Sequence, residues 1–212
     1  MRNFTITILA VLLYTTCNAQ AQKEWSFGLK AGANYSTISN IPFDLASYKF
    51  GFHVGGVASL GINDRFSVVS ELTFSRQGWE QAPIEVRETP GDLPVVFTIV
   101  EHYDYINIPV LADYNVVGGL SFQAGPQFGI FISDDFSIKD ESRPVDVDSG
   151  LFNQDAIPKN TLEVGGVFGL RYLFQSGIFM DARYVVGLSN VFENSATNIA
   201  NRNAQVSLGV LW

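Results

Sequence analysis

The sequence predicts an all-β protein in which eight antiparallel strands close into an up-and-down transmembrane β-barrel. Apolar and other residues alternate with a period of two along most of the chain after residue 21, as on strands with two unlike faces. Hydrophobic residues make up 47% of the chain and charged residues only 16%, whereas soluble domains have about a quarter charged. No run after residue 14 approaches the ~20 apolar residues of a membrane-spanning helix. A closed barrel is the other structure that satisfies every backbone polar group in lipid.

The first 21 residues are predicted to be a secretory signal peptide, which leaves residues 22–212 as a single barrel domain. Arg2 is followed by an apolar stretch at 4–14, which is too short to cross the bilayer as a helix. Ala19-Gln20-Ala21 is a small-x-small cleavage site, and Cys17-Asn18-Ala19 is the alternative. Cleavage after Ala21 would remove the single cysteine and with it any thiol chemistry.

Eight segments carry the alternation, each of roughly ten residues, which is the length of a tilted transmembrane strand. They are residues 25–35, 50–60, 66–74, 105–114, 120–130, 162–172, 178–187 and 203–212.

The predicted connections alternate between short and long, as in outer-membrane barrels with short periplasmic turns and long external loops. The short ones are residues 61–65, 116–119 and 175–177; the long ones are 37–49, 77–102, 133–160 and 189–202. Long loops on a rigid scaffold are where recognition usually occurs. Residues 77–102 and 133–160 are therefore the predicted contact loops.

The alternation alone also fits a soluble lipocalin-like barrel, whose apolar face points inward onto a ligand. The polar face favours the membrane barrel, because it is rich in Gly, Ser, Asn and Gln and carries few charges. In a lumen just wide enough for side chains, these charges are expected to pair. The predicted structural charge network is Lys30, Glu71, Asp113, Glu163, Arg171, Asp181 and Arg183.

Aromatic residues at the strand ends of the apolar face also favour a membrane barrel, although ordinary cross-strand packing likewise uses aromatics. Transmembrane barrels carry girdles of aromatic residues at the two membrane–water interfaces. The residues are Trp25, Tyr35, Tyr114, Tyr172 and Trp212. The last of them ends an alternating strand, and this is similar to the C-terminal signal by which the barrel-assembly machinery recognises its clients.

No motif for catalysis, a cofactor or a metal emerges. His53 is expected to be a hydrogen-bonded histidine of the lumen, whereas His102, beside Glu101 and Asp104, begins the fourth strand, where a rim site is conceivable. No sequence motif joins His102 to a serine nucleophile. A solvated loop is the favoured interpretation of the acidic stretch Asp134, Asp135, Asp140, Glu141, Asp146, Asp148 and Asp155, and a divalent cation site is the alternative.

The expected partners follow from the predicted location and from the charge. A net charge of −8 argues against nucleic acid, whose binders carry basic patches. Outer-membrane lipid and lipopolysaccharide, the barrel-assembly machinery during insertion, and an extracellular or envelope protein are expected. A structural or surface-interaction role is the main hypothesis. A narrow pore, a lipid-modifying enzyme and a soluble periplasmic binding barrel are the alternatives.

Several stretches resemble the PorT-like outer-membrane β-barrel family of Bacteroidetes. The resemblance covers nearly the whole chain after the signal peptide except the long loops, and it implies the barrel fold and an outer-membrane location but little about activity. The stretches are GLKAGANYSTI (28–38), residues 51–78, residues 105–133, GLRYLF (169–174), DARYVVGLSNV (181–191) and NRNAQVSLGVLW (201–212).

Overall fold

The structure is a computed structural model that describes residues 24–40, 46–81, 83–86, 95–140, 146–147, 159–193 and 197–212. The predicted signal peptide, residues 1–21, lies outside the described residues. Within these ranges no helix is long and apolar enough to cross a membrane.

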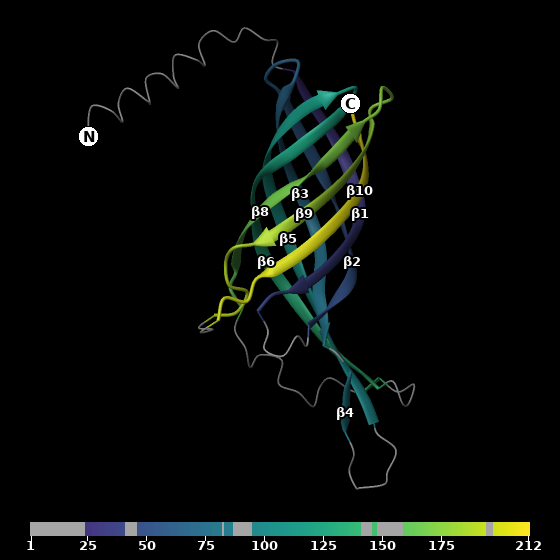
Figure 1. The fold of residues 1–212 in the computed structure, drawn as a ribbon, viewed down its shortest axis with the longest axis vertical. Coiled ribbons are helices and arrows are strands. Elements are labelled where there is room, and N and C mark those ends of the chain that lie inside the picture. Colours follow the sequence, from purple (N-terminus) through teal and green to yellow (C-terminus); the bar gives the residue numbers. More distant parts are fainter. Residues whose placement is uncertain are drawn as a thin grey trace, which may run out of the picture.

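One antiparallel sheet of ten strands forms the protein, and eight of the strands close into a barrel (Figure 1). The barrel strands are β1 (Trp25–Ile38), β2 (Ala46–Gly61), β3 (Phe66–Gln81), β5 (Val95–Val117), β6 (Leu120–Asp140), β8 (Leu162–Leu173), β9 (Ile178–Gly187) and β10 (Asn201–Leu211). Each pairs with the next, and β1 pairs with β10 to close the ring. Two short strands, β4 (Ile84–Val86) and β7 (Asp146–Val147), pair with the ends of β5 and β6. The predicted eight-stranded barrel is confirmed.

The two faces of each strand differ as the alternation predicts. On β1, Lys30, Asn34 and Ser36 are buried in the lumen, whereas Leu29 and Tyr35 are exposed on the outer wall. The outer wall carries a continuous set of exposed apolar side chains, here called the apolar belt, such as Phe27, Phe52, Leu72, Val110, Phe128, Leu170, Met180 and Leu208. The apolar face therefore points outward, which contradicts the lipocalin-like alternative.

Short turns join the strands at one end of the barrel, as predicted. The β5–β6 turn has two central glycines, Gly118 with φ 55° and Gly119 with φ 87°. Positive φ at both central positions is what a two-residue type I′ hairpin requires. In the β2–β3 turn, the side-chain oxygen of Asn63 accepts hydrogen bonds from the backbone N–H groups of Arg65 and Phe66. The C-terminus lies at this same end (Figure 1), the short-turn end.

At the opposite, long-loop end, the structure corrects the predicted loops at 77–102 and 133–160. β3 continues to Gln81, β5 begins at Val95, and β6 continues to Asp140, with Phe97 of β5 paired to Asp140. We call residues 75–81 of β3, 95–105 of β5 and 131–140 of β6 the extension. Its base belongs to the barrel wall, where Ser75 pairs with His53 and Gln81 with Ala46 of β2. Its tip, formed by the ends of β5 and β6 together with β4, projects beyond the rest of the barrel (Figure 1). In this part of β5, Thr98 and Val100 are buried and Val96 and Ile99 are partly buried, so apolar side chains occupy both faces. The period-two alternation is therefore lost although the backbone pairing continues.

Candidate functional site

Six charged side chains from five strands meet in the lumen. Glu71 is at their centre, and its carboxylate accepts two hydrogen bonds from the guanidinium of Arg183, at 2.7 and 2.9 Å. Lys30 and Arg171 each lie 3.3 Å from the same carboxylate. This bidentate arrangement, with two further donors, is the strong form of a charge-assisted hydrogen bond. The members are Lys30 of β1, Glu71 of β3, Asp113 of β5, Arg171 of β8, and Asp181 and Arg183 of β9.

Asp181 is the second acceptor of this lumen network. It lies 3.1 Å from both Lys30 and Arg183 and 3.7 Å from Arg171. Asp113 lies 3.9 Å from Arg171 and accepts a hydrogen bond from Gln123 at 2.5 Å. Three cations therefore face three carboxylates, and each of these side chains is at most 10% exposed. Such balance is what permits ionised groups to be buried, since an unpaired buried charge is very costly.

The structure does not bring Glu163, the seventh predicted member, into this network. Glu163 lies near the start of β8, toward the long-loop end, where Asn201 donates to it at 2.5 Å and to the hydroxyl of Tyr105 at 3.3 Å. Alternation determines which face a residue occupies. It does not determine the height along the barrel, and therefore it gave the right face for Glu163 but not its partners.

A neutral polar layer follows the lumen network toward the long-loop end. The ring of His53 is buried, with Nδ1 2.8 Å from Oδ1 of Asn34 and Nε2 2.7 Å from the hydroxyl of Ser207. Asn34 also donates to Ser75 at 2.9 Å. His53 is thus the hydrogen-bonded lumen histidine that the sequence predicts.

Side chains also fill the lumen toward the short-turn end. Val57, Val69, Leu111, Val167, Phe179 and Val185 form a buried apolar cluster. The guanidinium of Arg171 lies 4.4 Å from the ring centre of Phe179, which adds a cation–π contact to the lumen network. A polar cavity of about 140 Å³ reaches from Asp64 and Arg65 in the β2–β3 turn to Asp113 and Arg171. This cavity makes the lumen network accessible from the short-turn end.

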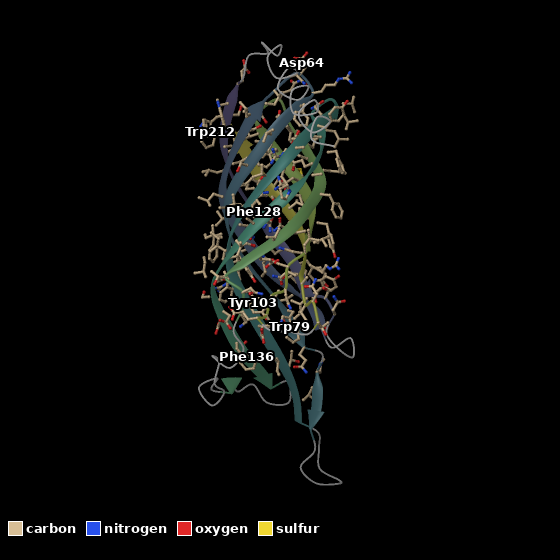
Figure 2. All side chains as sticks on the ribbon, turned by 90° about the vertical axis from the view of Figure 1, so that its left-hand side faces the viewer. Asp64, Trp79, Tyr103, Phe128, Phe136 and Trp212 are labelled. Carbon is tan, nitrogen blue, oxygen red and sulfur yellow. The ribbon has the colours of Figure 1, made fainter. Side chains whose placement is uncertain are left out.

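A second cluster lies where the extension leaves the barrel. Tyr103 is fully buried; its hydroxyl accepts a hydrogen bond from the indole N–H of Trp79 at 3.1 Å and donates one to Glu101. Burial and the nearby charge of Glu101 raise the pKa of Tyr103 well above its ordinary value. Lys159 lies 5.0 Å from the ring centre of Tyr103 and forms an ion pair with Asp134 of β6. Figure 2 shows Tyr103 and Trp79 toward the end opposite Asp64.

The prediction that His102 begins a strand is wrong, because His102 lies within β5. The ammonium of Lys49 is 2.5 and 2.8 Å from its two ring nitrogens. Burial, followed by the charges of Lys49 and Arg76, lowers the pKa of His102. Arg76 in turn binds Asp104 through two hydrogen bonds of 2.8 and 2.7 Å, and Ser133 donates to Asp104 at 3.4 Å. No hydroxyl is hydrogen-bonded to His102 among the described residues.

The acidic stretch is only partly described. Asp134, Asp135 and Asp140 belong to β6 and Asp146 to β7, whereas Glu141, Asp148 and Asp155 lie outside the described residues. In the part of the chain that the structure covers, no group of three acidic, His or Cys side chains is placed to hold a metal ion.

The predicted girdle residues lie on the outer wall at the borders of the apolar belt. Trp25, Tyr35, Tyr114, Tyr172 and Trp212 are between 41% and 68% exposed. Tyr35 stacks on Tyr48, with ring centres 4.7 Å apart. Trp212 joins the barrel by exchanging two backbone hydrogen bonds with Phe27 of β1. An aromatic ring at a belt border, partly apolar and partly wet, suits a membrane interface.

Three solved structures illustrate the similarity to known barrels. Neisserial surface protein A is 15% identical, with 87% of this chain and 96% of that chain covered and a TM-score of 0.48. Ail, the attachment invasion locus protein of Yersinia pestis, is 14% identical, with 89% and 99% covered and a TM-score of 0.48. OprG from Pseudomonas aeruginosa is 12% identical, with 92% and 99% covered and a TM-score of 0.46. No curated protein matches the chain.

The family assignment rests on a family model together with the geometry. The model described as "Outer membrane protein beta-barrel domain" matches residues 18–193, which is most of the chain. The closed ring of eight strands and the outward apolar belt agree with it. The chain therefore belongs to the outer membrane protein beta-barrel domain family and is a protein of the bacterial outer membrane.

Proposed function

We propose that the protein is a non-catalytic surface protein that uses the extension as a rigid platform for contact with an extracellular or envelope partner. The observation that carries this proposal is the length of the paired strands. β5 has 23 residues and β6 has 21, whereas β9 and β10 have 10 and 11. A tilted strand needs about 9–11 residues to cross the membrane. The excess length of β5 and β6 lies outside the bilayer.

Backbone pairing makes this platform rigid. The β5–β6 ladder continues from Tyr105 paired with Phe131 to Phe97 paired with Asp140, and the Trp79–Tyr103 cluster supports its base. A surface ordered in advance loses little conformational entropy on binding, which favours affinity.

The described surface of the platform carries more acidic than basic side chains, together with the exposed apolar side chain of Ile132. Ser133, Asp134 and Asp135 are exposed on β6, and Glu80 and Glu101 are partly exposed on β3 and β5. A partner that presents basic groups matches this surface, since complementary charge increases the rate and the specificity of association.

Site-specific photo-crosslinking in the native host tests the proposal. A photoreactive amino acid at Phe136 of the extension should give a discrete crosslinked species. The same group at Phe128 on the apolar belt, or at Asp64 in a short turn, should not give it. The three positions lie at three heights along the barrel (Figure 2). Absence of any adduct specific to position 136, with the folded barrel at its usual abundance, would contradict the proposal.

A narrow pore is the second candidate, and the filled lumen disfavours it. The lumen network, the His53 layer and the Trp79–Tyr103 cluster occupy successive heights of a barrel whose eight strands leave little more than side-chain space. We expect the purified protein to show no stepwise conductance in planar bilayers. Reproducible single-channel steps that respond to Glu71→Gln would favour the pore.

Catalysis is not part of the proposal. His102 is the one rim histidine that the sequence singles out, and its ring nitrogens lie against Lys49 rather than against a nucleophile. We also propose that residues 1–21 are a cleaved signal peptide, that Trp212 belongs to the signal read by the barrel-assembly machinery, and that no nucleic acid is bound. The narrower assignment to the PorT-like barrels of Bacteroidetes stays a prediction.

A further inference from the structure

A polar pocket opens on the outer wall directly above the apolar belt at the long-loop end. It has a volume of about 360 Å³, which is at the small end of the range for ligand sites. Four adjacent strands each contribute one outward side chain to it: Tyr48 of β2, Thr37 of β1, Arg202 of β10 and Tyr184 of β9. The rest of its lining is Ile38, Ser39, Asn40 and Ala46.

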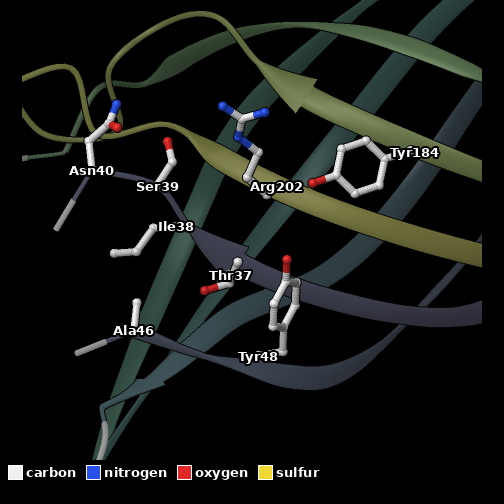
Figure 3. Close-up of a pocket in the computed structure, with 8 residues that line it drawn as sticks. All are labelled: Thr37, Ile38, Ser39, Asn40, Ala46, Tyr48, Tyr184 and Arg202. Atoms are coloured by element: carbon white, nitrogen blue, oxygen red, sulfur yellow. The ribbon is translucent and has the colours of Figure 1, made fainter. Parts of the chain in front are cut away.

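The register of the strands explains why these side chains converge. Thr37 pairs with Arg202, and the next outward pair toward the membrane is Tyr35 with Ala204. Ala204 in turn pairs with Tyr184. The side chains of Tyr35, Ala204 and Tyr184 therefore form one row, and Arg202 and Thr37 lie in the row beyond it, on the water side. Figure 3 shows the hydroxyl of Tyr184 pointing toward Arg202 and the hydroxyl of Tyr48 pointing into the same group.

Arg202 is the chemical centre of the pocket. Among the described residues it has neither an ion pair nor a side-chain hydrogen bond. Arg171 and Arg183, in the lumen, instead form ion pairs with carboxylates. A guanidinium has five donors in a planar fork that suits a phosphate group. The hydroxyl groups of Tyr48 and Tyr184 add donors to phosphate oxygens around it, whereas the hydroxyl of Thr37 donates to the backbone oxygen of Ser47 at 3.3 Å.

The position of the pocket indicates that the phosphate belongs to a lipid rather than to a soluble anion. Immediately below it on the same wall, Phe50, Phe52 and Val206 are exposed and apolar, so that a ligand reaching the pocket from the side has its hydrophobic part against the belt. Tyr35 lies between Tyr48, on which it stacks, and Phe50, to which its ring is tilted, with ring centres 4.7 and 4.8 Å apart. This aromatic group marks the interface at which headgroups lie. A soluble anion would gain nothing from this apolar surface.

We propose that Arg202, with the hydroxyl groups of Tyr48 and Tyr184, forms a specific binding site for the phosphate of an outer-leaflet glycolipid, whose acyl chains lie along the belt below. The site is separate from the platform of the proposed function. It holds one lipid at a fixed side of the barrel, on β2, β1, β10 and β9.

The test uses the full-length mature protein, refolded in detergent micelles, with diphosphorylated lipid A as the probe and native mass spectrometry as the readout. The variants are Arg202→Gln and, as a matched control, Arg65→Gln. Arg65 is an exposed arginine in a short turn at the opposite end of the barrel. Both variants lose one positive charge, and heat-modifiability on SDS gels shows that both fold.

We expect one tightly retained lipid A for the wild type and for Arg65→Gln. Because one charge-assisted contact is lost, Arg202→Gln should bind about tenfold more weakly or worse. Dephosphorylated lipid A should bind the wild type about as weakly as intact lipid A binds Arg202→Gln. Higher ionic strength should narrow the difference.

Three results would overturn the proposal. The first is equal retention of lipid A by the wild type and Arg202→Gln. The second is equal retention of intact and dephosphorylated lipid A by the wild type. In the third, inorganic phosphate alone competes with lipid A at the same concentration, which would mean that the site takes a free anion rather than a lipid.

Discussion

The lumen network should be sensitive to the loss of Glu71 in particular. Glu71→Gln keeps the shape of the side chain but removes one of three negative charges, so that three buried cations then face two carboxylates. Glu71 contacts all three cations, at 2.7 Å for Arg183 and 3.3 Å for Lys30 and Arg171, and its side chain is only 2% exposed. Removing one partner of a buried pair costs about 3–5 kcal/mol, so we expect the free energy of unfolding to fall by about that amount.

Urea unfolding of the refolded barrel in detergent, followed by tryptophan fluorescence, measures this loss. A double-mutant cycle then separates charge from packing. Lys30→Gln combined with Glu71→Gln restores two cations against two carboxylates, and the double variant should be about 1–3 kcal/mol more stable than the sum of the single changes implies. Asp64→Asn, at an exposed turn, should change the free energy of unfolding by less than about 0.5 kcal/mol. Strict additivity, or a loss below about 1 kcal/mol for Glu71→Gln, would refute the reasoning.

Two further predictions concern the extension and the packing of the lumen. The pKa of His102 is lowered in the folded state, so as the pH falls through the ordinary value of 6.5 the opened state gains the proton before the folded state does, and the extension loses stability. Hydrogen exchange of the backbone amides of residues 97–105, corrected for intrinsic rates, should show this loss of stability between about pH 7.5 and 5.5. His102→Gln should abolish the loss, and the same pH dependence in His102→Gln as in the wild type would contradict the prediction. Gly209→Ala should cost about 1–3 kcal/mol in urea unfolding, because a Cβ atom there would meet the ring of Phe179. Gly166→Ala, with nothing within 4 Å, is its control, and equal stability of the two variants would contradict the packing argument.

The barrel was predictable because lipid imposes one repeated rule on every strand. Between Trp25 and Tyr35, for example, each outward side chain meets lipid and each inward one meets the lumen, so the alternation is unbroken. The rule ends where the lipid ends. Residues 95–100 (VVFTIV) are apolar apart from Thr98 and show no alternation, so the pattern predicts a loop where the structure has a strand. Their β-branched composition was the signal that could have identified it.

The alternation predicts which side of the barrel wall a side chain occupies, but it does not predict which side chains meet there. All seven predicted lumen charges point inward, but the meeting of Lys30 with Asp181 depends on β1 and β9 being brought to one height by the closed ring. The outer-wall pocket was missed for the same reason. Arg202 and Tyr48 are 154 positions apart in the sequence, and they become neighbours through the pairing of β1 with β10, which no local pattern records.

The charges of the lumen are divided unequally along the chain. Of the six members of the lumen network, the first four barrel strands carry Lys30, Glu71 and Asp113, which is one negative charge in excess, and the last four carry Arg171, Asp181 and Arg183, which is one positive charge in excess. Within this network neither set of four strands is neutral by itself, and neutrality arises only when the two sets form one barrel. In the lumen network, the first four and the last four barrel strands are therefore electrostatic complements. Two fragments divided at an external loop should attract each other and reassemble, whereas two copies of the same half should not.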